Sequence, residues 1–424
     1  MPSLLNELAN RGLIAQVSDE PGLEQHLETG SRTVYCGFDP TADSLHIGNL
    51  VPLITLRRFQ LHGHRPILLL GGATGMIGDP SGRSSERNLN DVDVIAGWVE
   101  EIRAQAERFL DFSGNQAAVV VNNLDWTREL GVISFLRDVG KHFSVNQMIQ
   151  RESVRSRLTR EGEGISYTEF SYMLLQAMDY AELADRYGCS VQIGGSDQWG
   201  NIVSGMDLVR RKLAKESFAL TMPLITKADG SKFGKTAEGA VWLDPQKTSP
   251  YSFYQFWLNS ADADVVRFLR VFTFLDREEI DALAREVAES PEGREAQRRL
   301  AREVTAMTHG EEAVASSERI SHALFAGAIE GLSDRDLAQL EQDGMDCTRV
   351  LGDHIGLLAA LADTGLAGSR GEARRLVQSK GVSVNGQVQT DVERELDWHD
   401  AIEGRYYLLR RGKKSWHLLV RAAD

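Results

Sequence analysis

The chain has 424 residues, of which 42% are hydrophobic and 25% charged, a composition typical of a soluble globular protein rather than a disordered, collagenous or coiled-coil chain. Its length predicts two or three domains. The formal net charge of −14 excludes a protein that coats nucleic acid through its overall charge, although a local basic face is compatible with that total.

Cysteine usage and hydropathy predict a cytoplasmic protein without a membrane span. The three cysteines, Cys36, Cys189 and Cys347, lack the spacing of a metal site or a disulfide framework. The longest apolar-neutral window, residues 66–78, is shorter than the ~20 residues that a spanning helix needs. Leucines near the N-terminus share one helical face among charged residues, which indicates an amphipathic helix rather than a signal peptide.

The first 220 residues alternate between strand-like and helix-like segments. Apolar and β-branched runs predict strands at 33–37, 66–70, 117–121 and 190–193. Apolar residues at helical spacing predict intervening helices, one of them over Leu50–Phe59 with Gly63 as its stop. This alternation predicts an α/β fold, with a Rossmann-like parallel sheet covered by helices on both faces.

The pattern changes after about residue 245. Serine–proline pairs at 249–250 and 290–291 are typical of helix starts, and Asp276 with Glu279 forms a capping-box pattern. These signals predict an α-helical domain over 246–320. Residues 321–350 are acidic and loop-like, which favours a linker.

The remainder, 351–424, is predicted to be a small α+β domain. A short helix begins at Ser369 and ends near Gly381, and the Asn385-Gly386 pair predicts a hairpin. A second strand pair is expected around Gly412. From Thr364 onwards, 11 lysines and arginines stand against 8 acidic residues, a net +3 that leaves −17 for the rest.

A first polar segment, Tyr35–Asn49, follows a strand and enters a helix, where free backbone N–H groups and the helix dipole favour phosphate. Gly48 would let a flat base approach the backbone, and His46 and Thr41 could donate to phosphate oxygens. The alternative is an ordinary polar loop. A second segment, Gly71–Arg83, is glycine-rich and contains Asp79; it fits either close ligand approach or a long flexible loop.

Three further patterns carry polar groups. Tyr172, Gln176 and Asp179 share one helix face, which could line a pocket or face solvent. The segment Gln192–Gln198 passes from a strand through glycines into a helix, with Asp197 available for ribose hydroxyls. The segment Lys232–Thr236 has two lysines three residues apart, which suits either a polyphosphate clamp or a solvated loop.

In this order, the five segments closely resemble bacterial tyrosyl-tRNA synthetases, which are class I aminoacyl-tRNA synthetases. His46-Ile-Gly-Asn49 and Lys232-Phe-Gly-Lys235-Thr236 match the two class signatures, usually written HIGH and KMSKS. The resemblance covers essentially the whole chain. It departs at Asn49, where the usual motif has a second histidine. Because asparagine also donates a hydrogen bond, we expect altered strength rather than lost activity.

The resemblance implies a Rossmann-like catalytic domain over 1–245 with a dimerisation insertion, an anticodon-region domain over 246–320, a linker over 321–350 and an RNA-binding domain over 351–424. It also implies a homodimer that activates L-tyrosine with ATP and transfers the tyrosyl group to the terminal adenosine of tRNA(Tyr). Mg²⁺ would arrive with ATP, and no tightly bound protein metal is expected.

Roles for individual residues follow from the same resemblance. Donors for catalysis are Thr41, His46, Asn49, Lys232, Lys235 and Thr236. Tyrosine would be held by Tyr35, Asp79, Tyr172, Gln176, Asp179, Gln192 and Gln198, with Tyr35 and Asp179 at its hydroxyl. ATP would lie against Gly37, Asp39, His46, Gly48, Gly195, Asp197 and Lys235. RNA contacts would come from Arg370, Arg374, Arg375, Lys380, Arg410, Arg411, Lys413 and Lys414.

Two other interpretations stay open on sequence. The related tryptophanyl enzymes share the implied fold, although Tyr35, Asp179 and the Lys-Phe-Gly-Lys-Thr segment favour tyrosine. A synthetase-like RNA-binding protein without catalysis is the alternative from another class. The full set of phosphate donors argues against it.

Overall fold

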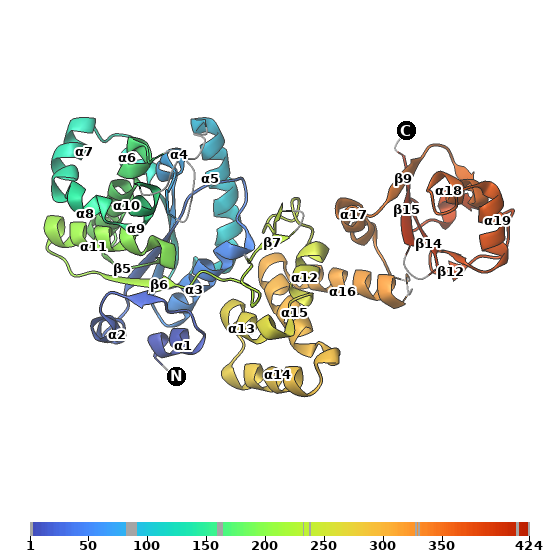
Figure 1. The fold of residues 1–424 in the computed structure, drawn as a ribbon, viewed down its shortest axis with the longest axis horizontal. Helices are drawn as coiled ribbons and strands as arrows, with labels where there is room; N and C mark the ends of the chain where they lie inside the picture. Colours follow the sequence, from blue (N-terminus) through green and yellow to red (C-terminus); the bar gives the residue numbers. More distant parts are fainter. Residues whose placement is uncertain are drawn as a thin grey trace. The chain divides into compact units, whose positions relative to one another are not determined.

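The computed structural model describes residues 3–81, 91–158, 164–231, 233–236, 239–326, 329, 331–412 and 415–422. The chain forms two compact units. Figure 1 colours the ribbon along the sequence, from blue at the N-terminus to red at the C-terminus. The first combines Met1–Asp244 with Ser260–Leu300, and the second combines Pro245–Asn259 with Ala301–Asp424.

A six-stranded sheet forms the centre of the first unit. Its order is β1 (Gln16–Val17), β6 (Phe218–Met222), β5 (Cys189–Gly195), β2 (Thr33–Phe38), β3 (Arg65–Leu70) and β4 (Val119–Asn122). All neighbours pair in parallel except β1, which runs antiparallel to β6. The four predicted strands are confirmed. Two strands were not predicted: β1, which is only two residues long, and the fully buried β6.

Helices cover both faces of this sheet. On one face, α3 (Leu50–Leu61) and α5 (Val92–Ala106) pack near β2 and β3. On the other face, α10 (Tyr167–Arg186) and α11 (Trp199–Leu213) pack near β5 and β6. Figure 1 shows the green helices α10 and α11 and the blue helices α3 and α5 on either side of the strands. The connection from β2 leads to β3 and the connection from β5 leads to β6, in the opposite direction along the sheet. With right-handed crossovers this places helices on both faces, and a crevice opens between the carboxyl ends of β2 and β5.

Further helices complete the first unit. They are α1 (Leu4–Asn10), α2 (Glu20–Glu28), α4 (Thr74–Ile77), α6 (Leu124–Thr127), α7 (Val132–Asp138), α8 (Val145–Ile149), α9 (Glu152–Leu158), α13 (Asp262–Phe272) and α14 (Arg277–Glu289). The capping box of α14 is present as predicted: Asp276 accepts from the Glu279 N–H, and Glu279 accepts from the Asp276 N–H. The helix α15 (Glu295–His309) runs from the first unit into the second.

The second unit contains helices and a five-stranded sheet. The helices are α12 (Pro250–Leu258), α16 (Glu311–Ala326), α17 (Asp334–Gln342), α18 (Leu357–Asp363) and α19 (Arg370–Gln378). The sheet has the order β12 (Gln387–Val388), β11 (Val382–Val384), β14 (Tyr406–Arg411), β15 (Ser415–Arg421) and β9 (Cys347–Val350). A separate pair joins β10 (His354–Gly356) to β13 (Glu395–Asp397). The predicted Asn-Gly hairpin and the strand pair around Gly412 are confirmed.

The prediction that residues 321–350 are loop-like is wrong. Much of this range is ordered secondary structure: the end of α16, all of α17, and β9. Leu337 and Leu340 of α17 are buried with Leu408 and Leu418 of the sheet, so α17 is an amphipathic helix with an acidic outer face. Residues 245–259 also group with the second unit. The domain boundaries at 245, 320 and 350 stay a prediction.

Candidate functional site

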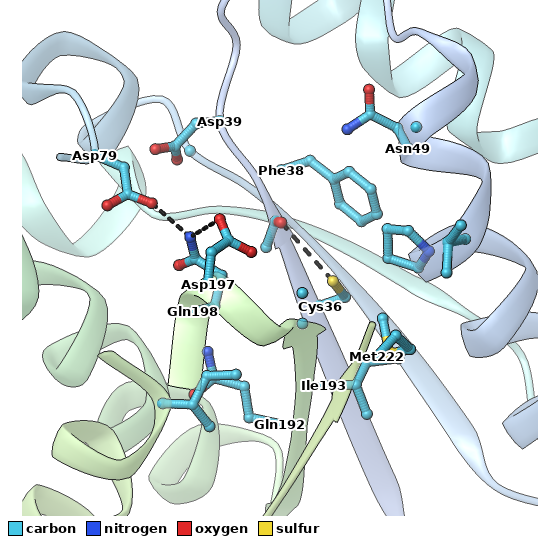
Figure 2. Close-up of a pocket in the computed structure, with 18 of the residues that line it drawn as sticks. Cys36, Phe38, Asp39, Asn49, Asp79, Gln192, Ile193, Asp197, Gln198 and Met222 are labelled. Carbon is cyan, nitrogen blue, oxygen red and sulfur yellow. Dashed lines mark hydrogen bonds between the residues drawn. The ribbon is translucent and has the colours of Figure 1, made fainter. Parts of the chain in front are cut away.

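A cavity of about 400 Å³ opens at the carboxyl ends of β2 and β5, at the crevice expected for a doubly wound sheet. Residues from the predicted tyrosine, nucleotide and catalytic sets line it together. They are Tyr35, Gly37, Asp39, His46, Gly48, Asn49, Asp79, Tyr172, Gln176, Asp179, Gln192, Gly195, Asp197 and Gln198. Figure 2 shows several of them converging from the strand ends and the following loops.

Tyr35 and Asp179 belong to the buried part of this cavity. Tyr35 is fully buried, and its hydroxyl has no hydrogen-bond partner among the residues that the structure describes. The Asp179 carboxylate accepts hydrogen bonds from Asn123 Nδ2 and Trp126 Nε1, both at 2.9 Å. Burial raises the pKa of Asp179 to about 7, although these two donors oppose the increase. The pocket therefore offers a free phenolic hydroxyl and an oriented carboxylate.

Asn123 and Trp126 were not among the predicted site residues. Both follow β4, the strand farthest in the sheet order from β5. Asn123 also connects the glycine-rich segment to the pocket, because its Oδ1 accepts from the Ala73 N–H at 2.7 Å and its Nδ2 donates to Thr74 Oγ1 at 2.9 Å. The only local sequence feature that pointed to these two residues was a pair of adjacent asparagines at the end of β4.

Asp39 lies farther along the pocket and accepts two short hydrogen bonds. The Tyr172 hydroxyl donates to Oδ2 at 2.6 Å, and Thr74 Oγ1 donates to Oδ1 at 2.6 Å. Burial raises the pKa of Tyr172, and the nearby Asp39 carboxylate raises it further. A Cβ at Gly71 would lie 2.0 Å from Asp39 Oδ1, so this turn requires glycine. The glycine-rich segment was predicted from the sequence, but Thr74 within it was not a predicted site residue.

Asp79, Asp197 and Gln198 form a polar group at the end of β5 (Figure 2). Gln198 Nε2 donates to Asp79 Oδ2 at 2.7 Å and to Asp197 Oδ2 at 3.2 Å. Burial raises the pKa of Asp197. Together with Asp39, these carboxylates give the pocket acceptors for an ammonium group and for ribose hydroxyls.

The first signature segment is held by local hydrogen bonds. His46 Nδ1 accepts from the Gly48 N–H at 3.0 Å, and Asn49 Oδ1 accepts from the His46 N–H at 3.0 Å. This reciprocal cap starts a short 3₁₀ turn, Ile47–Asn49, that leads into α3. Asn49 thus orients the turn through its oxygen. Thr41 is exposed and does not line the cavity.

The second signature segment lies beside the first. The Val241 N–H donates to the Gly234 carbonyl at 3.1 Å, and the Ile47 N–H donates to the Val241 carbonyl at 3.0 Å. Phe233 lines the cavity, although it was not a predicted site residue. Of the predicted residues, Lys232 lies outside the described residues, and Lys235 and Thr236 are described only through the backbone of β7 (Lys235–Thr236).

Cys36 is a further lining residue that sequence reasoning did not assign to the site (Figure 2). Burial raises the pKa of its thiol to about 12, so the group is a neutral thiol at pH 7 rather than a nucleophile.

The predicted RNA-contact residues fall into two groups. Arg370, Arg374, Arg375 and Lys380 are exposed on or just after α19, with Arg374 paired to Glu393 at 3.1 Å. Arg410 and Arg411 make internal contacts: Arg410 lies 4.7 Å from the centre of the Trp416 ring, and Arg411 donates to the Leu366 carbonyl at 2.7 Å. Lys413 and Lys414 lie outside the described residues.

Among the described residues, no group of three or more histidine, cysteine or acidic side chains is arranged to hold a metal ion. In the same part of the chain, no helix combines the length and apolar character needed to cross a bilayer.

The fold and the paired signature segments define a class of protein. A family model described as tRNA synthetases class I (W and Y) matches residues 27–326, which contain the whole cavity. A second, described as a tyrosine–tRNA ligase SYY-like C-terminal domain, matches residues 336–419. The catalytic unit is therefore that of a class I tRNA synthetase.

Individual relatives sharpen this assignment. The tyrosine–tRNA ligase of Laribacter hongkongensis (strain HLHK9) is 57% identical over 420 residues, covering 99% of this chain and 98% of that protein. That of Yersinia enterocolitica (serotype O:8 / biotype 1B) is 55% identical, covering 98% of each. A C-terminally truncated Aspergillus nidulans mitochondrial tyrosyl-tRNA synthetase superimposes with a TM-score of 0.70 at 30% identity, covering 77% of this chain and 95% of that one. The chain belongs to the tyrosine–tRNA ligase family.

Proposed function

We propose that this chain is an ATP-dependent tyrosine–tRNA ligase. It activates L-tyrosine to tyrosyl-adenylate with release of pyrophosphate, and then transfers the tyrosyl group to the 3′-terminal adenosine of tRNA(Tyr). The observation that carries this proposal is the buried pair of Tyr35 and Asp179 in the cavity, where a hydroxyl without a partner among the described residues accompanies an oriented carboxylate.

This pair suits a phenol better than an indole. A phenolic hydroxyl both donates and accepts, so it can donate to the Asp179 carboxylate and accept from the Tyr35 hydroxyl. An indole N–H only donates, and it would leave the Tyr35 hydroxyl unsatisfied. Phenylalanine would leave both groups without a partner, which costs free energy in a buried site. The proposed preference is therefore tyrosine over tryptophan and phenylalanine.

The first step needs positioning more than acid–base chemistry. The tyrosine carboxylate is ionised at pH 7 and attacks the α-phosphate of ATP, so catalysis rests on holding the reactants and stabilising charge on the departing pyrophosphate. In this proposal His46, Asn49, Lys232, Lys235, Thr236 and Thr41 serve the phosphates. Asp39 and Asp197 serve the nucleotide, and Asp79, Tyr172 and Gln176 serve the tyrosine ammonium. Mg²⁺ accompanies ATP.

ATP–pyrophosphate exchange tests the proposal directly. Purified protein should exchange label when tyrosine is supplied, and exchange with tryptophan or phenylalanine should be lower by several orders of magnitude. Charging of tRNA(Tyr) with labelled tyrosine then tests the second step. Tryptophan-dependent exchange would favour the sister enzyme. Absence of exchange with every amino acid, combined with tRNA binding, would favour an RNA-binding protein without catalysis.

The proposed assembly is a homodimer. Apolar side chains are exposed on α7 and α8, including Val132 at 71%, Ile133 at 74% and Val145 at 57% exposure, and a protein partner would cover them. In analytical ultracentrifugation the wild type should sediment as a dimer and Ile133→Asp as a monomer. An unchanged sedimentation coefficient in Ile133→Asp would place the interface elsewhere. We also propose a cytoplasmic location, supported by the three free cysteines.

A further inference from the structure

The second signature segment, whose Phe233 lines the ligand pocket, is docked along one face of α13, a helix that contributes no lining residue to that pocket. Asp264, Phe268 and Phe272 are spaced four residues apart on this helix and are all buried. Residues at that spacing lie on one helix face, one turn above another. The stretch from Thr226 to Gly234, which leads into and includes part of the signature, contacts this face at both of its ends.

At its beginning, the stretch is held by polar contacts. The Ala228 N–H donates to both Asp264 carboxylate oxygens, at 2.9 and 3.1 Å. Arg267 forms an ion pair with Asp264 at 2.8 Å and donates to the Thr226 carbonyl. Because Asp264 is only 3% exposed, the carboxylate is well placed to fix the backbone rather than to bind solvent.

At its other end, the stretch is held by aromatic packing. The Phe233 ring stacks on Phe272 at 5.1 Å between centroids and meets the edge of Phe268, also at 5.1 Å. The next residue, Gly234, has φ +83°, and a Cβ there would lie 3.1 Å from Ile47 of the first signature segment. The Phe233-Gly234 pair is therefore confined between α13 on one side and the first signature segment on the other.

The C-terminal end of α13 is anchored by hydrogen bonds from two arginines. Arg58 and Arg11 both donate to the Thr273 carbonyl directly after α13, and Arg11 also donates to the Leu275 carbonyl at 2.8 Å. Since Arg58 lies on α3, which begins at the first signature segment, α13 is connected to the catalytic sheet independently of Phe233. A rigid support of this kind can set the position of whatever packs on it.

We infer that Phe233 is a positioning residue for adenylate formation, acting through its contact with Phe268 and Phe272 of α13. Lys232 and Lys235 immediately flank the Phe233-Gly234 pair in the sequence. Loss of the docking of this pair is therefore expected to impair the contribution of both proposed phosphate donors to catalysis. This inference rests on the proposed function. It adds that the catalytic competence of the signature depends on an aromatic contact with a helix that does not line the ligand pocket.

The test compares Phe233→Ala with Phe233→Met in tyrosine-dependent ATP–pyrophosphate exchange. Misplacement of phosphate donors by about 1 Å can cost up to about a hundredfold in rate, so kcat of Phe233→Ala should fall about tenfold to a hundredfold. KM for tyrosine should stay within about twofold, because transition-state rather than tyrosine contacts are lost. Phe233→Met keeps a long apolar side chain and should restore most of kcat.

Two controls separate positioning from general destabilisation. Phe59→Leu removes part of a fully buried ring elsewhere in the same unit, and it should lower the melting temperature without the drop in kcat. Phe272→Leu should lower kcat by itself, and its effect should not add to that of Phe233→Ala, since both remove one contact.

Three outcomes would overturn the inference. They are normal kcat in Phe233→Ala, equal losses of kcat in Phe59→Leu, or a rise in KM for tyrosine with kcat unchanged, which would make Phe233 only a wall of the substrate pocket. Each of these outcomes is informative only if the wild-type protein itself shows tyrosine-dependent exchange. Absence of exchange in the wild type would instead contradict the proposed function.

Discussion

Asp179, the proposed acceptor for the substrate hydroxyl, is a buried carboxylate whose ionised form is disfavoured in the ligand-free protein. Its carboxylate is 2% exposed, and the side chains that donate hydrogen bonds to it, Asn123 and Trp126, are both neutral. Two neutral donors orient a carboxylate but only partly replace its hydration. Because this lost hydration is not fully replaced, the pKa of Asp179 rises to about 7. A bound phenol would supply a third hydrogen-bond donor to the carboxylate.

Replacing Asp179 by alanine should abolish tyrosine activation while the fold survives. The substitution removes the proposed acceptor for the phenolic hydroxyl and leaves Tyr35, Asn123 and Trp126 without it. We expect exchange activity to fall by several orders of magnitude, measured with tyrosine well above its wild-type KM, and circular dichroism to stay unchanged. Normal exchange in Asp179→Ala would contradict the pocket assignment.

The same carboxylate should make the stability of the ligand-free protein depend on pH. Its folded-state pKa of about 7 lies above the ordinary value of 3.8, so the folded state retains a proton that the unfolded state releases. The stabilising contribution of that proton is fully present below pH 3.8 and is lost as pH rises through about 7. The free energy of unfolding that is lost in this way is on the order of a few kcal/mol.

Thermal melts of wild type and Asp179→Asn at pH 5 and pH 8 measure this contribution. Asparagine does not titrate, so the variant should gain stability relative to wild type on going from pH 5 to pH 8. Parallel pH profiles for the two proteins would show that Asp179 keeps an ordinary pKa in the fold.

At the scale of elements, the helix α1 is held in place by its Glu7 carboxylate, which contacts three basic side chains. Glu7 Oε1 accepts from Arg58 Nη1 at 2.6 Å and from Arg11 Nε at 2.9 Å, while His62 Nε2 lies 3.4 Å from Oε2. Burial lowers the pKa of the Arg58 guanidinium to about 10, so it remains charged at pH 7. Glu7 therefore supplies the counter-charge for a buried cation that also supports α13.

We predict that Glu7→Gln lowers the free energy of unfolding by about 1–3 kcal/mol in urea titrations. Breaking a fully buried pair costs about 3–5 kcal/mol, and the smaller value follows because Glu7 is 21% exposed. The matched control is Glu107→Gln, which breaks the exposed pair with Arg103 and should change stability by less than about 1 kcal/mol. Equal effects of the two substitutions would mean that Arg58 needs no counter-charge.

At the scale of the whole molecule, charge is distributed unevenly along the chain. The acidic excess belongs to residues 1–363, which contain the ligand pocket, and the final 61 residues carry the +3. Exposed basic residues on and after α19 provide a local surface for phosphate even though the total charge is −14. Whole-chain charge averages over these two parts.

Truncation after residue 326 should separate the two proposed activities. A cut at 351 would remove β14 and β15, which cover Leu337 and Leu340 of α17, and it would leave β9 without its partner β15. A cut at 326 removes α17 and β9 together with these strands. Residues 1–326 should retain pyrophosphate exchange within about threefold of the full chain, and tRNA charging should fall steeply because the basic surface is lost. Equal losses of exchange and charging would argue against this division.

Several features followed from sequence because their signals are local. The strands β2 to β5, the hairpin at Asn385-Gly386 and the start of α3 depend on short-range patterns of burial, turn geometry and capping. The two signature segments were recognisable because each keeps its residue types at fixed spacing within a few positions. These features therefore do not require knowledge of distant contacts.

Tertiary structure decided what local patterns do not encode. Trp126 reaches Asp179 across 53 residues of chain, Tyr172 reaches Asp39 across 133, and Phe233 meets a helix that begins at Asp262. The amphipathic helix α17 looked like an acidic linker until the sheet that buries Leu337 was in place. Spacing along a chain specifies which groups are available, whereas their partners depend on which strand ends and helix faces packing brings together.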